Sequence, residues 1–170
     1  MNVRALAATA VAASLLLGTA GCGVFVETAT LKPYAASDGI NVTVGSIDLR
    51  DVLIITDETG DGSLIGTVVN NSGTVAHLTV ELRGATALTE VIAVEPGVTL
   101  LGVAGSTATI FSGAELSAGQ YATVYVQYGS ADGVETPVPV LDGTDPLYAS
   151  YTPTLLAPTP EPVVEETPAP

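Results

Sequence analysis

The sequence contains very few of the side chains that usually carry chemistry. Its 170 residues include one cysteine, one histidine, one methionine and no tryptophan. A single cysteine excludes an internal disulfide. With one histidine and no second cysteine, no pairing of a nucleophile with a histidine base of the usual kind can be proposed. We therefore predict that the protein is not an enzyme and that it uses no cofactor.

Basic residues are also scarce. Four Lys and Arg stand against 18 Asp and Glu, which gives a formal net charge of −14. Nucleic-acid binding needs a basic surface, so this partner is excluded. Docking on anionic lipid headgroups by charge is disfavoured for the same reason. The acidity fits a soluble surface that resists aggregation, and attraction for cations or basic partners is the alternative.

What the sequence has in plenty is Val, Thr, Ile, Leu and Gly, and no segment shows sustained helical periodicity. Short apolar runs separated by turn residues are typical of an all-β domain. We expect about seven to nine strands over residues 40–152, which indicates an immunoglobulin-like β-sandwich. Residues 49–56 predict a central strand buried on both faces.

Three further segments carry strand patterns. Residues 75–83 alternate, with Ala76, Leu78, Val80 and Leu82 predicted to face the core. Residues 121–128 alternate in the same way. Residues 134–141 contain Pro137 and Pro139, so we expect an edge strand or an extended segment there.

The N-terminal residues 1–21 have the three-part layout of a signal peptide. Arg4 is followed by an apolar run from Ala5 to Leu17 and then by small residues that lead to Cys22. The run is shorter than the roughly 20 apolar residues of a membrane span. We predict cleavage before Cys22 and lipid attachment at Cys22, which would hold the protein on the outer side of the cell membrane. Cleavage after Gly18-Thr19-Ala20 without lipid, or an uncleaved anchor, are the alternatives.

The rest of the chain divides by composition. Residues 22–39 are predicted to be the lipidated cysteine and a tether, ending at an Asp38-Gly39 turn. Residues 153–170 include six prolines and three glutamates, and we predict a disordered tail that acts as a spacer.

One stretch imitates a calcium-binding loop. Asp57, Thr59, Asp61 and Gly62 follow the opening of the motif, but the twelfth position, where a bidentate Glu is required, is Val68. The flanking residues also have strand patterns rather than helical ones. We interpret the stretch as a polar hairpin turn.

The histidine and the tyrosines offer little more. His77 is predicted to lie on the solvent-facing side of its strand, with Thr79 and Glu81 as its neighbours on that side. A base or a metal ligand needs partners within hydrogen-bond reach. Tyr121, Tyr125 and Tyr128 are common interface residues, but they are also ordinary strand residues.

The order of these motifs resembles a known group of proteins. The Cys22 motif, Arg50-Asp51-Val52-Leu53-Ile54-Ile55 and Leu64-Ile65-Gly66-Thr67-Val68-Val69 look like small actinobacterial lipoproteins of the LpqE type, over roughly residues 15–130. Those lipoproteins are similar in turn to periplasmic copper chaperones of the PCuAC kind. That resemblance implies a cupredoxin-like β-sandwich holding Cu(I) through Met and His side chains.

The sequence departs from that family where copper would bind. Its sole methionine, Met1, belongs to the predicted signal peptide, and His77 is alone. No copper ligand can be carried over, and we predict no metal site. We expect an exported lipoprotein with a binding or structural role in the cell envelope. Its partners would be the membrane, through Cys22, and an unknown protein or other envelope component. A divergent metal chaperone is the alternative.

Overall fold

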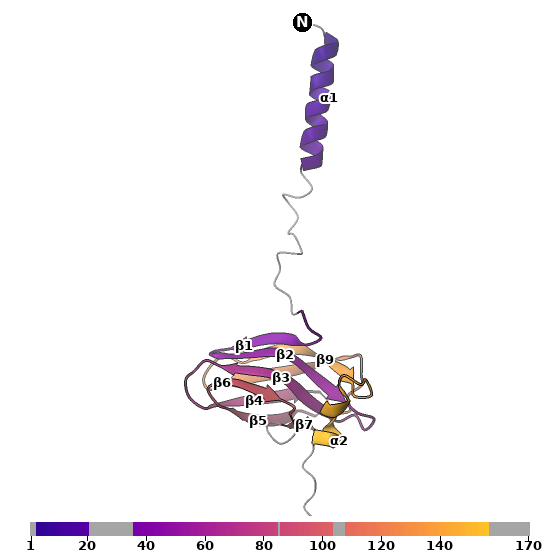
Figure 1. The fold of residues 1–170 in the computed structure, drawn as a ribbon. Helices are drawn as coiled ribbons and strands as arrows, with labels where there is room; N and C mark the ends of the chain where they lie inside the picture. Colours follow the sequence, from indigo (N-terminus) through magenta and orange to yellow (C-terminus); the bar gives the residue numbers. More distant parts are fainter. Residues whose placement is uncertain (1–2, 21–35, 85, 104–107, 157–170) are drawn as a thin grey trace, which may run out of the picture. The chain divides into compact units, whose positions relative to one another are not determined.

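The computed structural model describes residues 3–20, 36–84, 86–103 and 108–156 (Figure 1). The chain forms two compact units, Met1–Tyr34 and Ala35–Pro170. The first contains helix α1 (Val3–Ala20). No helix within the described ranges has both the length and the apolar character needed to cross a membrane. Cys22 and most of the predicted tether lie outside the described residues.

The second unit is all-β. Its described part contains nine strands, which agrees with the predicted number and with a sandwich-like fold. They are β1 (Ile40–Val44), β2 (Ile47–Thr56), β3 (Gly62–Asn70), β4 (Ala76–Arg83), β5 (Leu88–Val94), β6 (Gly97–Leu101), β7 (Thr109–Phe111), β8 (Tyr121–Tyr128) and β9 (Val134–Asp142).

The strands form one curled sheet in the order β5-β4-β8-β9-β2-β3-β6, with β1 beside β2 and β7 beside β3. All pairings are antiparallel except that of β2 with β9. Because the sheet curls, side chains of β2 and β3 meet those of β4 and β8 in one core. Its fully buried members include Phe111, Ile47, Ile54, Leu64, Leu78, Val80 and Val124.

The side chains of β4 alternate between buried and exposed positions, as predicted. Ala76, Leu78, Val80 and Leu82 are buried, while the residues between them are exposed or half-buried. Successive side chains of a strand point to opposite faces, so one face of β4 enters the core and the other faces solvent.

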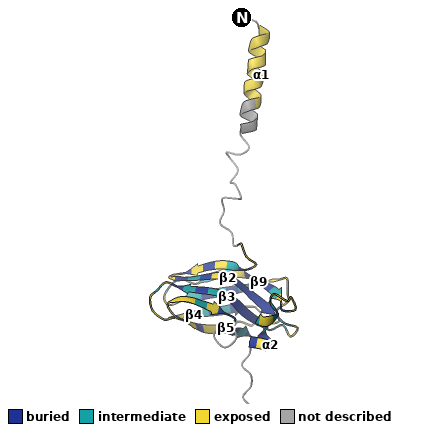
Figure 2. Ribbon diagram, in the orientation of Figure 1, coloured by how far each residue is buried: buried dark blue, intermediate teal, exposed yellow. Residues whose placement is uncertain are grey.

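Strand β2 is central, and its apolar run, residues 52–55, is buried on both faces, as predicted (Figure 2). Ile54 lies in the main core. Leu53 and Ile55 point the other way and form a second cluster with Ile65. Leu141, Tyr148 and Tyr151 pack against this second cluster, which keeps it from solvent.

The prediction of an edge strand at residues 134–141 is wrong. Strand β9 lies between β8 and β2 and joins the two halves of the sheet. Pro137 and Pro139 are tolerated because residues two apart turn their backbone nitrogens to the same side. Val140, which has the opposite orientation, donates its N–H to Gln120 on the β8 side at 2.9 Å. The prolines therefore face away from β8, along a part of β9 that has no pairing with β2.

A closing segment, residues 143–156, follows β9 and covers the second cluster. It contains the 3-10 helix η2 (Ala149–Tyr151) and the one-turn helix α2 (Pro153–Leu156). The hydroxyl of Ser63, which is buried in β3, donates a hydrogen bond to the Tyr151 carbonyl. The domain therefore extends four residues past the boundary predicted at 152. Proline suits the first position of a helix, and Leu156 is buried. Residues 157–170 of the predicted tail lie outside the described residues.

Candidate functional site

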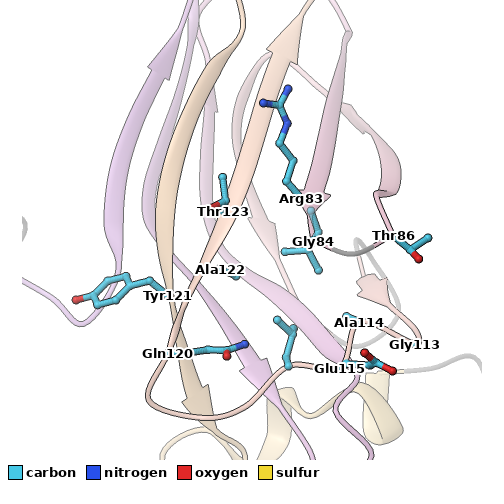
Figure 3. Close-up of a pocket in the computed structure, with 12 residues that line it drawn as sticks. Arg83, Gly84, Thr86, Gly113, Ala114, Glu115, Gln120, Tyr121, Ala122 and Thr123 are labelled. Carbon is cyan, nitrogen blue, oxygen red and sulfur yellow. The ribbon is translucent and has the colours of Figure 1, made fainter.

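A hollow of about 380 Å³ opens where β4 ends and β8 begins (Figure 3). It is lined by the end of β4 with the chain that follows it, and by two neighbouring stretches about 30 residues further along. The described lining residues are Leu82, Arg83, Gly84, Thr86, Gly113, Ala114, Glu115, Leu116, Gln120, Tyr121, Ala122 and Thr123. Its volume is near the lower limit of about 300 Å³ for small-molecule sites.

The hollow follows from the unequal lengths of two paired strands. The register of β4 with β8 ends at Arg83 opposite Thr123. Strand β8 begins two residues earlier, at Tyr121, and on its other side it continues to pair with β9. A notch is left beside the first turn of chain after β4, and the loop between β7 and β8 forms its opposite wall.

The floor of the hollow is apolar and its rim is polar. Leu82, Leu116 and Ala122 belong to the core. The side chain of Gln120 extends from the start of β8 toward the β7–β8 loop, which carries Glu115 on the other side of the hollow (Figure 3). The ring of Tyr121 is 70% exposed and points away from these groups. The rim can therefore offer an amide and a carboxylate but not an aromatic face.

The wall that carries Glu115 is held in a strained conformation. Glu115 has φ of 53°, a region that residues other than glycine rarely adopt. The next residue, Leu116, is buried, and its N–H donates to the Gly60 carbonyl at 2.9 Å. The N–H of Gly113 donates to Asp61 Oδ1 at 2.8 Å. These contacts hold the loop against a strain of about 1–3 kcal/mol.

Arg83 lies at the margin of the hollow but its charge is already engaged. Its Nε donates to Glu81 Oε1 at 3.1 Å, and its Nη1 forms an ion pair with Glu135. The guanidinium carbon lies 4.5 Å from the centre of the Tyr125 ring. Two carboxylates and an aromatic face thus surround this cation, so it does not present a free positive charge to a ligand.

The stretch that imitates a calcium loop is the hairpin turn between β2 and β3, as predicted. Asp57 Oδ1 accepts hydrogen bonds from the N–H and the hydroxyl of Thr59, at 3.0 and 2.5 Å. Asp57 Oδ2 accepts one from the Thr154 hydroxyl at 2.9 Å, and Asp61 Oδ1 holds Gly113. These carboxylates build the turn and attach its neighbours. Within the described ranges, no group of three or more His, Cys, Asp or Glu side chains is placed to hold a metal ion.

The other residues considered from the sequence do not come together. His77 is exposed, as predicted, and pairs across the strands with Ala93. Tyr121 and Tyr125 lie on the solvent-facing side of β8, whereas Tyr128 packs against the main core. The three tyrosines therefore do not form one patch.

Sequence reasoning missed Glu115 and Gln120. Both belong to the β7–β8 loop, whose position depends on the pairing of distant strands, and neither is part of a motif. The glycines at 113 and 119, both with positive φ, mark a shaped loop but do not indicate a binding site.

The fold and the hollow define an all-β, sandwich-like domain with a shallow polar hollow at one end. Comparison with known proteins adds no closer identification, since no family model and no curated protein matches the chain. The resemblance to LpqE-type lipoproteins stays a prediction.

Proposed function

We propose that the protein is an exported lipoprotein. A lipid on Cys22 would hold the β-domain at the outer face of the cell membrane, where it has a non-enzymatic binding or structural role in the envelope. The observation that carries this proposal is the motif Thr19-Ala20-Gly21-Cys22, which closes an apolar segment on the sole cysteine of the chain. Small residues before the cysteine suit the narrow site of a signal peptidase.

Binding is favoured over catalysis by the composition of the hollow. Among the twelve described residues that line it, Glu115 is the one acidic group, and histidine and cysteine do not occur. General acid–base catalysis needs positioned titratable groups with suitable pKa values. A rim of amide, hydroxyl and carboxylate groups supports recognition of a polar ligand instead.

The anchor is tested by replacing its attachment point. The full chain is expressed in a bacterium that processes lipoproteins and is fed an alkyne fatty acid. We expect the wild-type protein to be labelled and to fractionate with membranes, and Cys22→Ala to lose both properties. The matched variant Thr19→Leu, which introduces the residue usual at this position, should be labelled at least as well. Membrane fractionation of Cys22→Ala after removal of residues 1–21 would overturn the proposal.

We do not extend the proposal to copper. The metal-chaperone alternative requires a set of soft ligands. The described His77 stands opposite Ala93 on an exposed strand face. Copper measured on the purified protein distinguishes the two functions, since a chaperone would bind it stoichiometrically.

A further inference from the structure

We propose that the hollow between β4, β8 and the β7–β8 loop binds a neutral, hydroxyl-rich carbohydrate. An envelope polysaccharide would present such a ligand, so the source of the sugar rests on the proposed function.

The fold leaves three polar side chains of the hollow without an intramolecular hydrogen bond to any described residue. The side chains of Thr86, Glu115 and Gln120 make no hydrogen bond with other described residues. They lie on two sides of the hollow, with Gln120 on one and Glu115 and Thr86 on the other (Figure 3). A carboxylate accepts, an amide both donates and accepts, and a hydroxyl does either. Sugar hydroxyls, which also donate and accept, match all three.

The charge of the hollow favours a neutral ligand. Arg83 and Glu115 are the charged residues among the described lining, and Arg83 is engaged by Glu81 and Glu135. Glu115 therefore supplies the free charge of the hollow, in a chain with a net charge of −14. An anionic ligand such as a phosphate would be repelled. A simple ammonium group would satisfy Glu115 but would make no use of the amide N–H groups of Gln120.

The wall of the hollow that carries Glu115 is already ordered by contacts with the rest of the domain. Glu115 keeps its left-handed conformation because Leu116 is buried and Gly113 is bonded to Asp61. A ligand that meets a fixed wall does not have to order it on binding. Strained residues that the surrounding structure holds in place occur often at binding sites.

The hollow is shallow and offers few hydrogen bonds, so binding is expected to be weak, with a dissociation constant on the order of 1 mM. Several such domains on one membrane would bind a repeating polymer more tightly than a single domain binds one unit.

The test uses the full chain, purified in detergent from whichever fraction contains it, and saturation-transfer NMR. The probes are neutral gluco-, manno-, galacto- and arabino-oligosaccharides, with inorganic phosphate and a lysine peptide as the competing classes. We expect saturable binding of at least one oligosaccharide and none of phosphate. The variants Gln120→Ala and Glu115→Asn should each weaken the affinity for that oligosaccharide at least tenfold. Asparagine is chosen because it tolerates the left-handed conformation.

The matched controls are Gln127→Ala, in β8, and Glu58→Gln, in the β2–β3 turn, both outside the hollow. They should bind as the wild-type protein does. Three outcomes would overturn the proposal: no oligosaccharide binds, the hollow variants bind oligosaccharide as well as the controls do, or the lysine peptide binds and the oligosaccharides do not. Because the measurement is made in detergent, it does not depend on whether Cys22 carries a lipid.

Discussion

The phenolic oxygen of Tyr148 donates a hydrogen bond to the carboxylate of Asp38, across 110 residues of sequence. Asp38 precedes β1, and Tyr148 belongs to the closing segment and packs against the cluster of Leu53, Ile55 and Ile65. One side chain thus joins the two ends of the domain and also helps to cover the second face of β2.

This contact predicts a loss of stability in alkali. The hydrogen bond to Asp38 raises the pKa of Tyr148 from 10.0 to about 12, with smaller effects from desolvation and from the charges of Asp51 and Asp145. The contribution of this hydrogen bond to the free energy of unfolding is fully present below pH 10. It is lost as the pH rises toward 12, because the unfolded chain releases the proton first. Urea unfolding at several pH values should show a steeper decline for the wild-type protein than for Tyr148→Phe. Tyr121→Phe, on an exposed ring, should decline as the wild type does, and an unchanged slope in Tyr148→Phe would contradict the prediction.

The hydroxyl of Ser63 is expected to contribute measurably to stability. Ser63 is fully buried and donates to the Tyr151 carbonyl, so Ser63→Ala leaves that acceptor without its donor. We expect a loss of about 1–3 kcal/mol in the free energy of unfolding, measured in urea. Ser130→Ala, in an exposed turn, should change it by less than about 0.5 kcal/mol. Equal effects of the two substitutions would show that the bond to Tyr151 contributes nothing.

Two glycines with nearly the same φ should respond differently to alanine. Gly73 has φ of 77° and nothing within 4 Å of an added Cβ, so Gly73→Ala is expected to cost about 1–2 kcal/mol from backbone strain alone. Gly102 has φ of 75°, but its added Cβ would lie 2.3 Å from Ile65 Cγ2. Gly102→Ala should cost a further 1–3 kcal/mol or so for overpacking. Thermal unfolding of the two variants checks the difference, and equal melting temperatures would argue against close packing at Gly102.

Docking of α2 can be tested with two adjacent leucines. Leu156 is 5% exposed and Leu155 is 64% exposed. Leu156→Ala is expected to lower the free energy of unfolding by about 2 kcal/mol, and Leu155→Ala by less than about 0.5 kcal/mol. If both substitutions are neutral in urea unfolding, the folded domain ends before Pro153, as the sequence alone predicted.

Local pattern was sufficient to predict the strands that lie between a core and solvent. In β4 and β8 every second residue is apolar, and the predicted limits of β8 are the observed ones. The unbroken apolar run of β2 predicted burial on both faces, and Ile54 and Ile55 are indeed both fully buried. In these strands, a side chain is apolar or polar mainly according to whether its face of the sheet is buried or exposed. The order of apolar and polar residues is therefore enough to predict which side chains are buried.

What failed depends on relationships between distant segments. Proline in β9 indicated an edge, yet both prolines point to the one side that has no partner. Residues 153–156 resembled the start of a tail, because a one-turn helix is too short to show a periodicity of its own. The hollow lies among three segments brought together by strand register. Gln120 and Glu115 gave no signal because neither forms a motif with its sequence neighbours.

The position of β9 has a consequence for the order in which the chain folds. The strand that joins the two halves of the sheet is the last to be synthesised, and its partners β2 and β8 precede it by very different distances in sequence. Until it emerges, the earlier strands can form hairpins but cannot complete the curled sheet. Folding dominated by such long-range pairings is slow. We therefore expect the domain to remain incomplete until β9 has been made, when the β2–β3 pair can first be joined to the β4–β8 pair.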